Sequence, residues 1–177
     1  MTPAGKAASV HDRLLAKARM SGNDFNLLLT QYALERFLYR ISVSRFQESF
    51  HLKGALLFSL WYDTPPDSIQ AMEIHEDARY GGIRIDLIGM LGTACCPVQI
   101  DIGYGEAVTP ALEFARFPAI LEDNPAPILR AYPRETVIAE MLEAIVSLGV
   151  ANSRMKDFFD LQALNLSASA KSMPRIV

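Results

Sequence analysis

The stretch FHLKGALLFSLW, residues 50–61, decides the fold. Residues 50–53 predict a short strand, Gly54 allows a tight turn, and the apolar residues that follow predict a buried helix. Further along the chain, residues 83–90 and 98–103 alternate apolar and polar side chains at period two, which is typical of strands. A strand, a glycine turn, a helix and further strands together predict an α+β domain.

The composition is that of an ordinary globular protein. Its 177 residues suffice for one domain; half of them are hydrophobic and 21% are charged. No apolar run approaches the ~18 residues of a membrane span, and residues 1–10 lack the apolar segment of a signal peptide. A cytoplasmic location without membrane partners is therefore expected, with Cys95 and Cys96 as free thiols. The net charge of −3 argues against broad, sequence-independent nucleic-acid binding, but it is compatible with contact to one RNA end.

Two helices are expected before the first strand. After a loose start, residues 9–20 show a helical pattern. Asp24 is expected to cap a second helix over residues 25–39, because its apolar side chains recur at helical spacing. Arg36 and Arg40 lie one turn apart and are interpreted as part of a solvated helix face.

Asp101 is the most informative charged residue of the predicted strands. Counting by twos places Gln99 and Asp101 on one face and Ile100 on the other. Residues 92–97 are predicted to form the hairpin loop before this strand. Aspartate is uncommon in strands, so Asp101 needs a specific explanation at this position. Two interpretations stay open with equal weight: a solvated face of an edge strand, or a metal ligand that projects from the sheet.

The sequence predicts a division into four parts. Residues 9–110 are expected to hold the N-terminal helices and the α/β core. Residues 111–132 are rich in proline and predict an extended crossing segment. Residues 133–165 are expected to form a helical part, and residues 166–177 a loose tail.

Two helices are predicted in the helical part. Pro133 suits a first helical turn, an apolar stripe follows it, and Gly149 is a suitable C-terminal cap. In the next predicted helix, Asp157 and Asp160 are three residues apart and therefore share a face.

Four motifs, in this order, carry a resemblance to a known family. They are residues 50–56 (FHLKGAL), 99–103 (QIDIG), 130–140 (RAYPRETVIAE) and 153–161 (SRMKDFFDL). Together they resemble the AbiEii/AbiGii toxin family, whose members are nucleotidyltransferase-like toxins of bacterial toxin–antitoxin and abortive-infection systems. The similarity extends over most of the chain, from about Ser9 to Leu161.

The resemblance implies a nucleotidyltransferase-like mixed sheet with N-terminal helices and a helical C-terminal part. It also implies transfer of nucleotides from an NTP to an RNA acceptor, often the 3′ end of tRNA, with Mg²⁺ as cofactor and a cognate antitoxin as partner. By position, Asp101 and Asp157 correspond to catalytic acids, and Asp101 to a metal ligand. Lys53, Gly54 and Asp160 correspond to nucleotide-binding residues.

Two departures from the family pattern bear on activity. The family normally has an Arg-Asp-x-Asp strand shortly after its Asp-Thr-Pro turn, whereas here Pro66 is joined directly to Asp67. Met141 stands where the family usually has a lysine. The alternatives to an active transferase are therefore an inactive scaffold that binds an antitoxin or RNA, and a remnant without a selected role.

Overall fold

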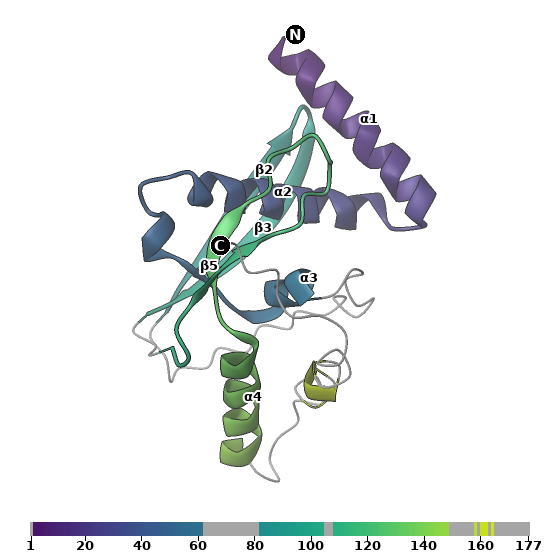
Figure 1. Ribbon diagram of the computed structural model, residues 1–177. Helices are drawn as coiled ribbons and strands as arrows, with labels where there is room; N and C mark the ends of the chain where they lie inside the picture. The colour runs from purple at the N-terminus through teal and green to yellow at the C-terminus, as the bar shows by residue number, and fades with distance from the viewer. Residues whose placement is uncertain are drawn as a thin grey trace. The chain divides into compact units, whose positions relative to one another are not determined.

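The computed structural model describes residues 2–61, 82–104 and 108–148, together with residues 158, 160–162 and 164 (Figure 1). The chain divides into two compact units that interleave along the sequence. Unit 1 comprises Met1–Val43, Glu73–Glu106 and Pro118–Pro127. Unit 2 comprises Ser44–Met72, Ala107–Phe117 and Ile128–Val177. Helices and strands occur in both units, which confirms the expected α+β class.

Two helices open unit 1. Helix α1 (Pro3–Ser21) begins earlier than expected, because the Thr2 side chain caps it by accepting a hydrogen bond from the Gly5 amide at 3.2 Å. The prediction of a loose start was therefore wrong. Helix α2 (Phe25–Ser42) confirms the cap at Asp24, whose carboxylate accepts from the Leu27 amide at 3.0 Å.

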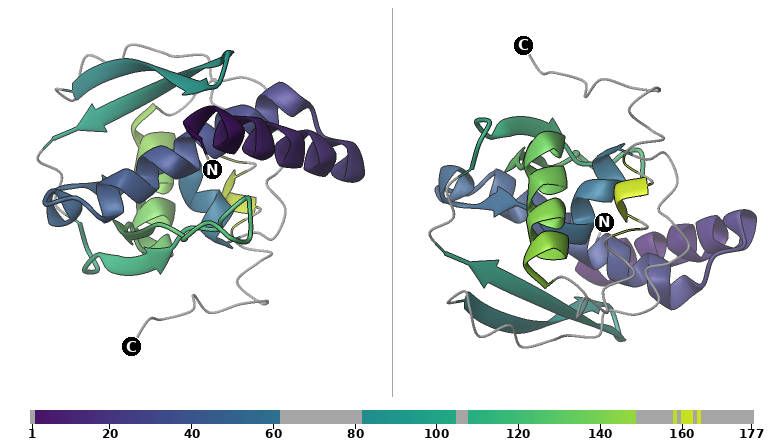
Figure 2. Two further views of the ribbon diagram at one scale, coloured as in Figure 1. Left: turned by 90° about the horizontal axis from the view of Figure 1, so that it is seen from above. Right: turned by 90° about the horizontal axis from the view of Figure 1, so that it is seen from below.

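A long antiparallel hairpin completes the regular structure of unit 1. Strand β2 (Gly82–Leu91) pairs with β3 (Ala94–Gly103), and both are drawn as teal arrows (Figure 2). The turn between them has two residues. The loop predicted over residues 92–97 is thus too long. The alternation of the strand continues back through Pro97, because an edge strand tolerates the missing N–H of proline. Cys96 is buried and Cys95 is exposed, and both are free thiols.

The core of unit 1 lies between its helices and one face of the hairpin. Gly89 of β2 explains how closely strand and helix approach, since a Cβ at this position would lie only 3.1 Å from the Cβ of Ala33. The fully or mostly buried members of this core are Leu14, Ala18, Leu28, Leu29, Cys96, Val98 and Leu121.

Polar contacts hold the loop of residues 118–127 against the two helices. The carboxylate of Glu35, which is completely buried, accepts hydrogen bonds from the Ile120 amide at 2.9 Å and from the guanidinium of Arg36. Arg36 also donates to the carbonyl of Pro125 at 2.7 Å. A buried carboxylate is costly unless it is paired, and here a cation and a backbone amide both pair with it.

Arg13 of α1 pairs with Asp123 in the same loop. Its guanidinium donates to both carboxylate oxygens, once at 2.9 Å. The hydrogen bond from Arg13 holds the pKa of Asp123 below its ordinary value.

We expect Arg13→Ala to raise the pKa of Asp123 towards that of an unpaired aspartate, as NMR titration of the carboxyl can show. Since the folded-state pKa is depressed, the pair stabilises the fold above the unfolded-state pKa and loses this effect as the pH falls through the folded-state pKa. The difference in stability between the wild type and Arg13→Ala should therefore be small and should vanish in acid. An unchanged pKa of Asp123 in the variant would contradict the pairing.

Unit 2 contains a mixed three-stranded sheet of order β1-β5-β4. Strand β1 (His51–Leu52) is parallel to β5 (Ile128–Ala131), and β4 (Glu113–Arg116) is antiparallel to β5. The segment 111–132, which was expected only as an extended crossing, thus supplies two strands.

Helices cover part of the sheet of unit 2. After β1, a 3₁₀ helix (Gly54–Leu57) leads into the short α3 (Phe58–Trp61). Helix α4 (Arg134–Leu148) confirms the helix expected after Pro133. The buried core of this unit consists of Leu57, Phe58, Ala115, Ala131, Tyr132, Val137 and Leu164.

Candidate functional site

Asp101 lies on the face of β3 that the alternation predicts. It is exposed, and the neighbouring positions Ile100 and Ile102 are more buried. In the hairpin register, Asp101 stands opposite Arg84 of β2. The Arg84 guanidinium donates to one carboxylate oxygen through Nε at 2.7 Å and to the other through Nη2 at 3.4 Å. Both oxygens of the expected metal ligand are therefore engaged by a cation of the same hairpin.

Lys53 and Gly54 lie between β1 and the 3₁₀ helix of unit 2. Gly54 has φ = 76°, so the turn expected after the first strand is present and requires a left-handed backbone. Lys53 is exposed, and its Nζ lies 5.9 Å from the ring centroid of Tyr132. The residues that follow form a 3₁₀ helix first and only four residues of α-helix, rather than the helix start that was expected to hold a phosphate.

Gly54→Ala should lower the free energy of unfolding by about 1 kcal/mol, because a Cβ is strained at this positive φ. No atom of the described residues lies within 4 Å of the position of that Cβ, so the expected loss comes from backbone strain rather than from a clash. Gly54→Asn is the matched control, since asparagine tolerates this conformation better. Urea denaturation of the three proteins tests this; an alanine variant as stable as the wild type would contradict the turn.

His51 lies on β1, two residues before Lys53 in the sequence. Burial, together with the charge of Arg130 on the paired strand, lowers the pKa of His51 below its ordinary value. The lowered pKa favours the neutral form of the imidazole.

The two acids of the predicted C-terminal helix differ in what the structure describes. Asp157 lies outside the described residues. Asp160 is helical and only 8% exposed, close to the fully buried Leu164. Asp101 belongs to unit 1, whereas Lys53, Gly54 and Asp160 belong to unit 2. Their convergence on one pocket stays a prediction.

Met141 behaves as a core residue. It lies on α4, is half-buried, and packs against the buried cluster of unit 2. A thioether at this position therefore has a structural role, and it offers no positive charge to a triphosphate.

The described residues do not fit the Mg²⁺ that the resemblance implies. Mg²⁺ is usually held by one or two carboxylates together with phosphate oxygens. Within residues 2–61, 82–104 and 108–148, and the few described beyond them, no group of three His, Cys, Asp or Glu side chains could hold a metal ion. The carboxylate of Asp101 already forms an ion pair with the guanidinium of Arg84. The junction of Pro66 and Asp67 lies outside the described residues.

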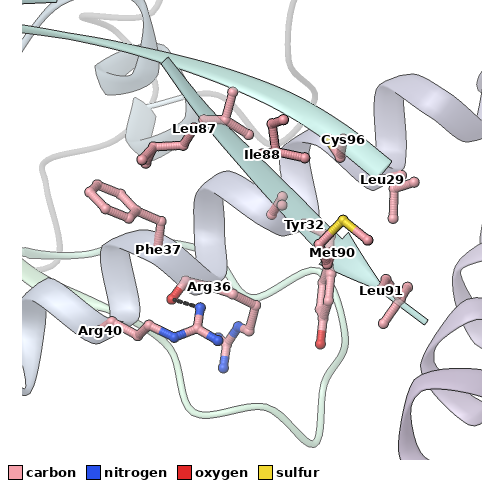
Figure 3. Close-up of a pocket in the computed structure, with 13 residues that line it drawn as sticks. Leu29, Tyr32, Arg36, Phe37, Arg40, Leu87, Ile88, Met90, Leu91 and Cys96 are labelled. Atoms are coloured by element: carbon pink, nitrogen blue, oxygen red, sulfur yellow. Dashed lines mark hydrogen bonds between the residues drawn. The ribbon is translucent and has the colours of Figure 1, made fainter. Parts of the chain in front are cut away.

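A groove of about 450 Å³ lies between α2 and the hairpin of unit 1 (Figure 3). Its walls are mainly apolar, but Arg36 and Arg40 bring two guanidinium groups to the same end. Arg40 donates to the carbonyl of Arg36 at 3.1 Å, and the buried Nε of Arg36 has no partner among the described residues. The interpretation of these arginines as a solvated face is therefore incomplete. In the sequence, Arg36 and Arg40 lie one helical turn apart and close to Tyr32 and Phe37. This combination of basic and aromatic residues on α2 is the sequence signal for the groove.

Among the described helices, none combines the length and the apolar character needed to cross a lipid bilayer. The cytoplasmic location stays a prediction.

A family model described as "Nucleotidyl transferase AbiEii toxin, Type IV TA system" matches residues 64–172, more than half of the chain. The matched range includes Asp101, Met141, Asp157 and Asp160, and it begins after Lys53 and Gly54. No curated protein and no solved structure matches the chain significantly.

Proposed function

Because this chain belongs to the family of AbiEii nucleotidyl transferase toxins of type IV toxin–antitoxin systems, we propose that it serves as the antitoxin-binding scaffold of such a pair and transfers nucleotides slowly or not at all. Membership of a toxin–antitoxin family implies a cognate antitoxin as partner. Direct binding of the antitoxin is part of this proposal, and most of the family's chemistry is absent from it.

The pairing of Asp101 with Arg84 is the observation that carries this proposal. Phosphoryl transfer depends on carboxylates that hold Mg²⁺ beside the triphosphate. A carboxylate whose two oxygens both accept from a guanidinium has part of its negative charge compensated, and the nearby positive charge weakens its attraction for Mg²⁺. The half-buried Met141 supports the same conclusion, since the family's usual lysine is replaced by a side chain that packs in the core.

A second candidate function is active transfer from an NTP to an RNA acceptor such as the 3′ end of tRNA. The exposure of Lys53 beside the Gly54 turn favours it, since a lysine in that position could meet a phosphate. In this alternative Lys53, Gly54 and Asp160 would bind the nucleotide, and Asp101 and Asp157 would be catalytic. The engaged carboxylate of Asp101 makes this the weaker of the two proposals.

Binding of the antitoxin can be tested with the protein encoded beside this one. Co-expression should give a complex that survives affinity and size-exclusion chromatography, and Asp101→Asn should leave it intact. An antitoxin from an unrelated toxin–antitoxin system is the matched control and should not co-purify. A chain that binds the neighbouring protein no better than this control would overturn the scaffold proposal.

A further inference from the structure

Strand β2 presents a free edge in the described part of unit 1. The hairpin is a two-stranded sheet in which β3 is the only described neighbour of β2. Every second residue of such a strand points its backbone N–H and C=O groups away from its partner. An edge of ten residues is therefore a template for another strand.

The two edges of the hairpin differ in how they are protected. Strand β3 contains Pro97, which cannot donate a backbone hydrogen bond, and its only charged residue is Asp101. If β3 paired with β3 of a second copy in an antiparallel sheet centred on Asp101, two carboxylates would lie opposite each other. Strand β2 contains neither proline nor lysine, and Ile83 and Ile85 are 51% and 36% exposed on it. Strand β2 lacks the proline that interrupts the edge of β3, and its two charged residues, Arg84 and Asp86, have opposite signs.

The charges of β2 are complementary to those of a second copy. Arg84 and Asp86 flank Ile85 symmetrically. In an antiparallel pair centred on Ile85, each Arg84 stands directly opposite Asp86 of the partner subunit. Opposite charges in such cross-strand positions stabilise a sheet, and like charges destabilise it. On the other face, Ile83 stands opposite Leu87 of the partner subunit and Ile85 opposite the partner's Ile85.

We propose that the chain forms a symmetric homodimer in which β2 pairs with β2 of a second copy, centred on Ile85, to make a four-stranded antiparallel sheet. The pair of Arg84 with Asp101 is retained, because a guanidinium has five N–H donors and can serve two carboxylates. A row of alternating charge then crosses the dimer from Asp101 through Arg84 to Asp86 of the partner subunit. This inference is independent of the proposed function, since it uses the hairpin alone.

The molar mass in solution tests the proposal, by light scattering after size-exclusion chromatography over a wide range of protein concentration. The wild type should reach about 39 kDa, twice the 19.6 kDa of one chain. Asp86→Arg places Arg opposite Arg twice and should weaken self-association at least about tenfold. Glu122→Arg, the same charge change on an exposed loop residue, should leave the dimer unchanged. A monomeric wild type, or a dimer indifferent to Asp86→Arg, would overturn the proposal.

Two further variants test the register. Inverting the whole row, with Asp86→Arg, Arg84→Asp and Asp101→Arg together, should restore the dimer. In a Cys95→Ser background, Ile85→Cys should form a disulfide between subunits on mild oxidation, because directly opposed residues lie within the reach of such a bond. Ile83→Cys should not, since its copies would be four residues, about 13 Å, apart along the strands. Cross-linking by both variants, or by neither, would exclude the proposed register.

Discussion

Glu35→Ala is expected to lower the free energy of unfolding by about 3 kcal/mol. The substitution removes a fully buried carboxylate and leaves the Ile120 amide without its acceptor. It also leaves the guanidinium of Arg36, only 15% exposed, without its anion. Breaking a buried ion pair by removing one partner commonly costs about 3–5 kcal/mol, and the remaining bond of Arg36 to the Pro125 carbonyl moderates the loss.

Chemical denaturation followed by far-ultraviolet circular dichroism measures this effect. Glu35→Gln should lose less than the alanine variant, because its amide oxygen can still accept from the Ile120 amide. Glu122→Ala is the matched control: it removes a carboxylate from an exposed position of the contacted loop and should change stability by less than about 0.5 kcal/mol. If Glu35→Ala lowered the free energy of unfolding no more than Glu122→Ala does, the contacts of Glu35 with residues 118–127 would not contribute to stability.

Short-range signals in the sequence predicted several elements correctly. Asp24 marks the start of α2 because a side-chain cap depends only on the next three residues. The alternation in β3 predicted its more buried and more exposed faces because helices cover one side of the strand, whereas Ile83 and Ile85 of β2 are exposed. The start of α1 was predicted too late, because the helix begins at Pro3 with the side chain of Thr2 as its cap.

Long-range pairing could not be predicted in the same way. The strands β4 and β5 have only four residues each and lie among prolines, so their pairing with β1 is visible only in three dimensions. The partner of Asp101 was missed for a related reason. A two-residue turn at residues 92–93 sets the register that places Arg84 opposite Asp101. The sequence predicted a longer loop at residues 92–97, and this loop does not define that register.

Nucleotide transfer by this chain is expected to be at least about 100-fold slower than transfer by an active member of the family. Losing the principal charge-stabilising groups of phosphoryl transfer commonly costs several kcal/mol of barrier, and each 1.4 kcal/mol is a factor of about ten. The pairing of Asp101 with Arg84 and the packing of Met141 in the core of unit 2 both point to such a loss. Arg84→Ala should free the carboxylate of Asp101 and yet fail to restore transfer, because Met141 remains.

The most direct test of this account is transfer of labelled NTP to total tRNA in the presence of Mg²⁺, with an active family member assayed in parallel. We predict no label above the background without enzyme for this chain, for Asp101→Asn and for Arg84→Ala, while the active relative labels the tRNA. Mg²⁺-dependent labelling by the wild-type chain that Asp101→Asn abolishes would contradict the account.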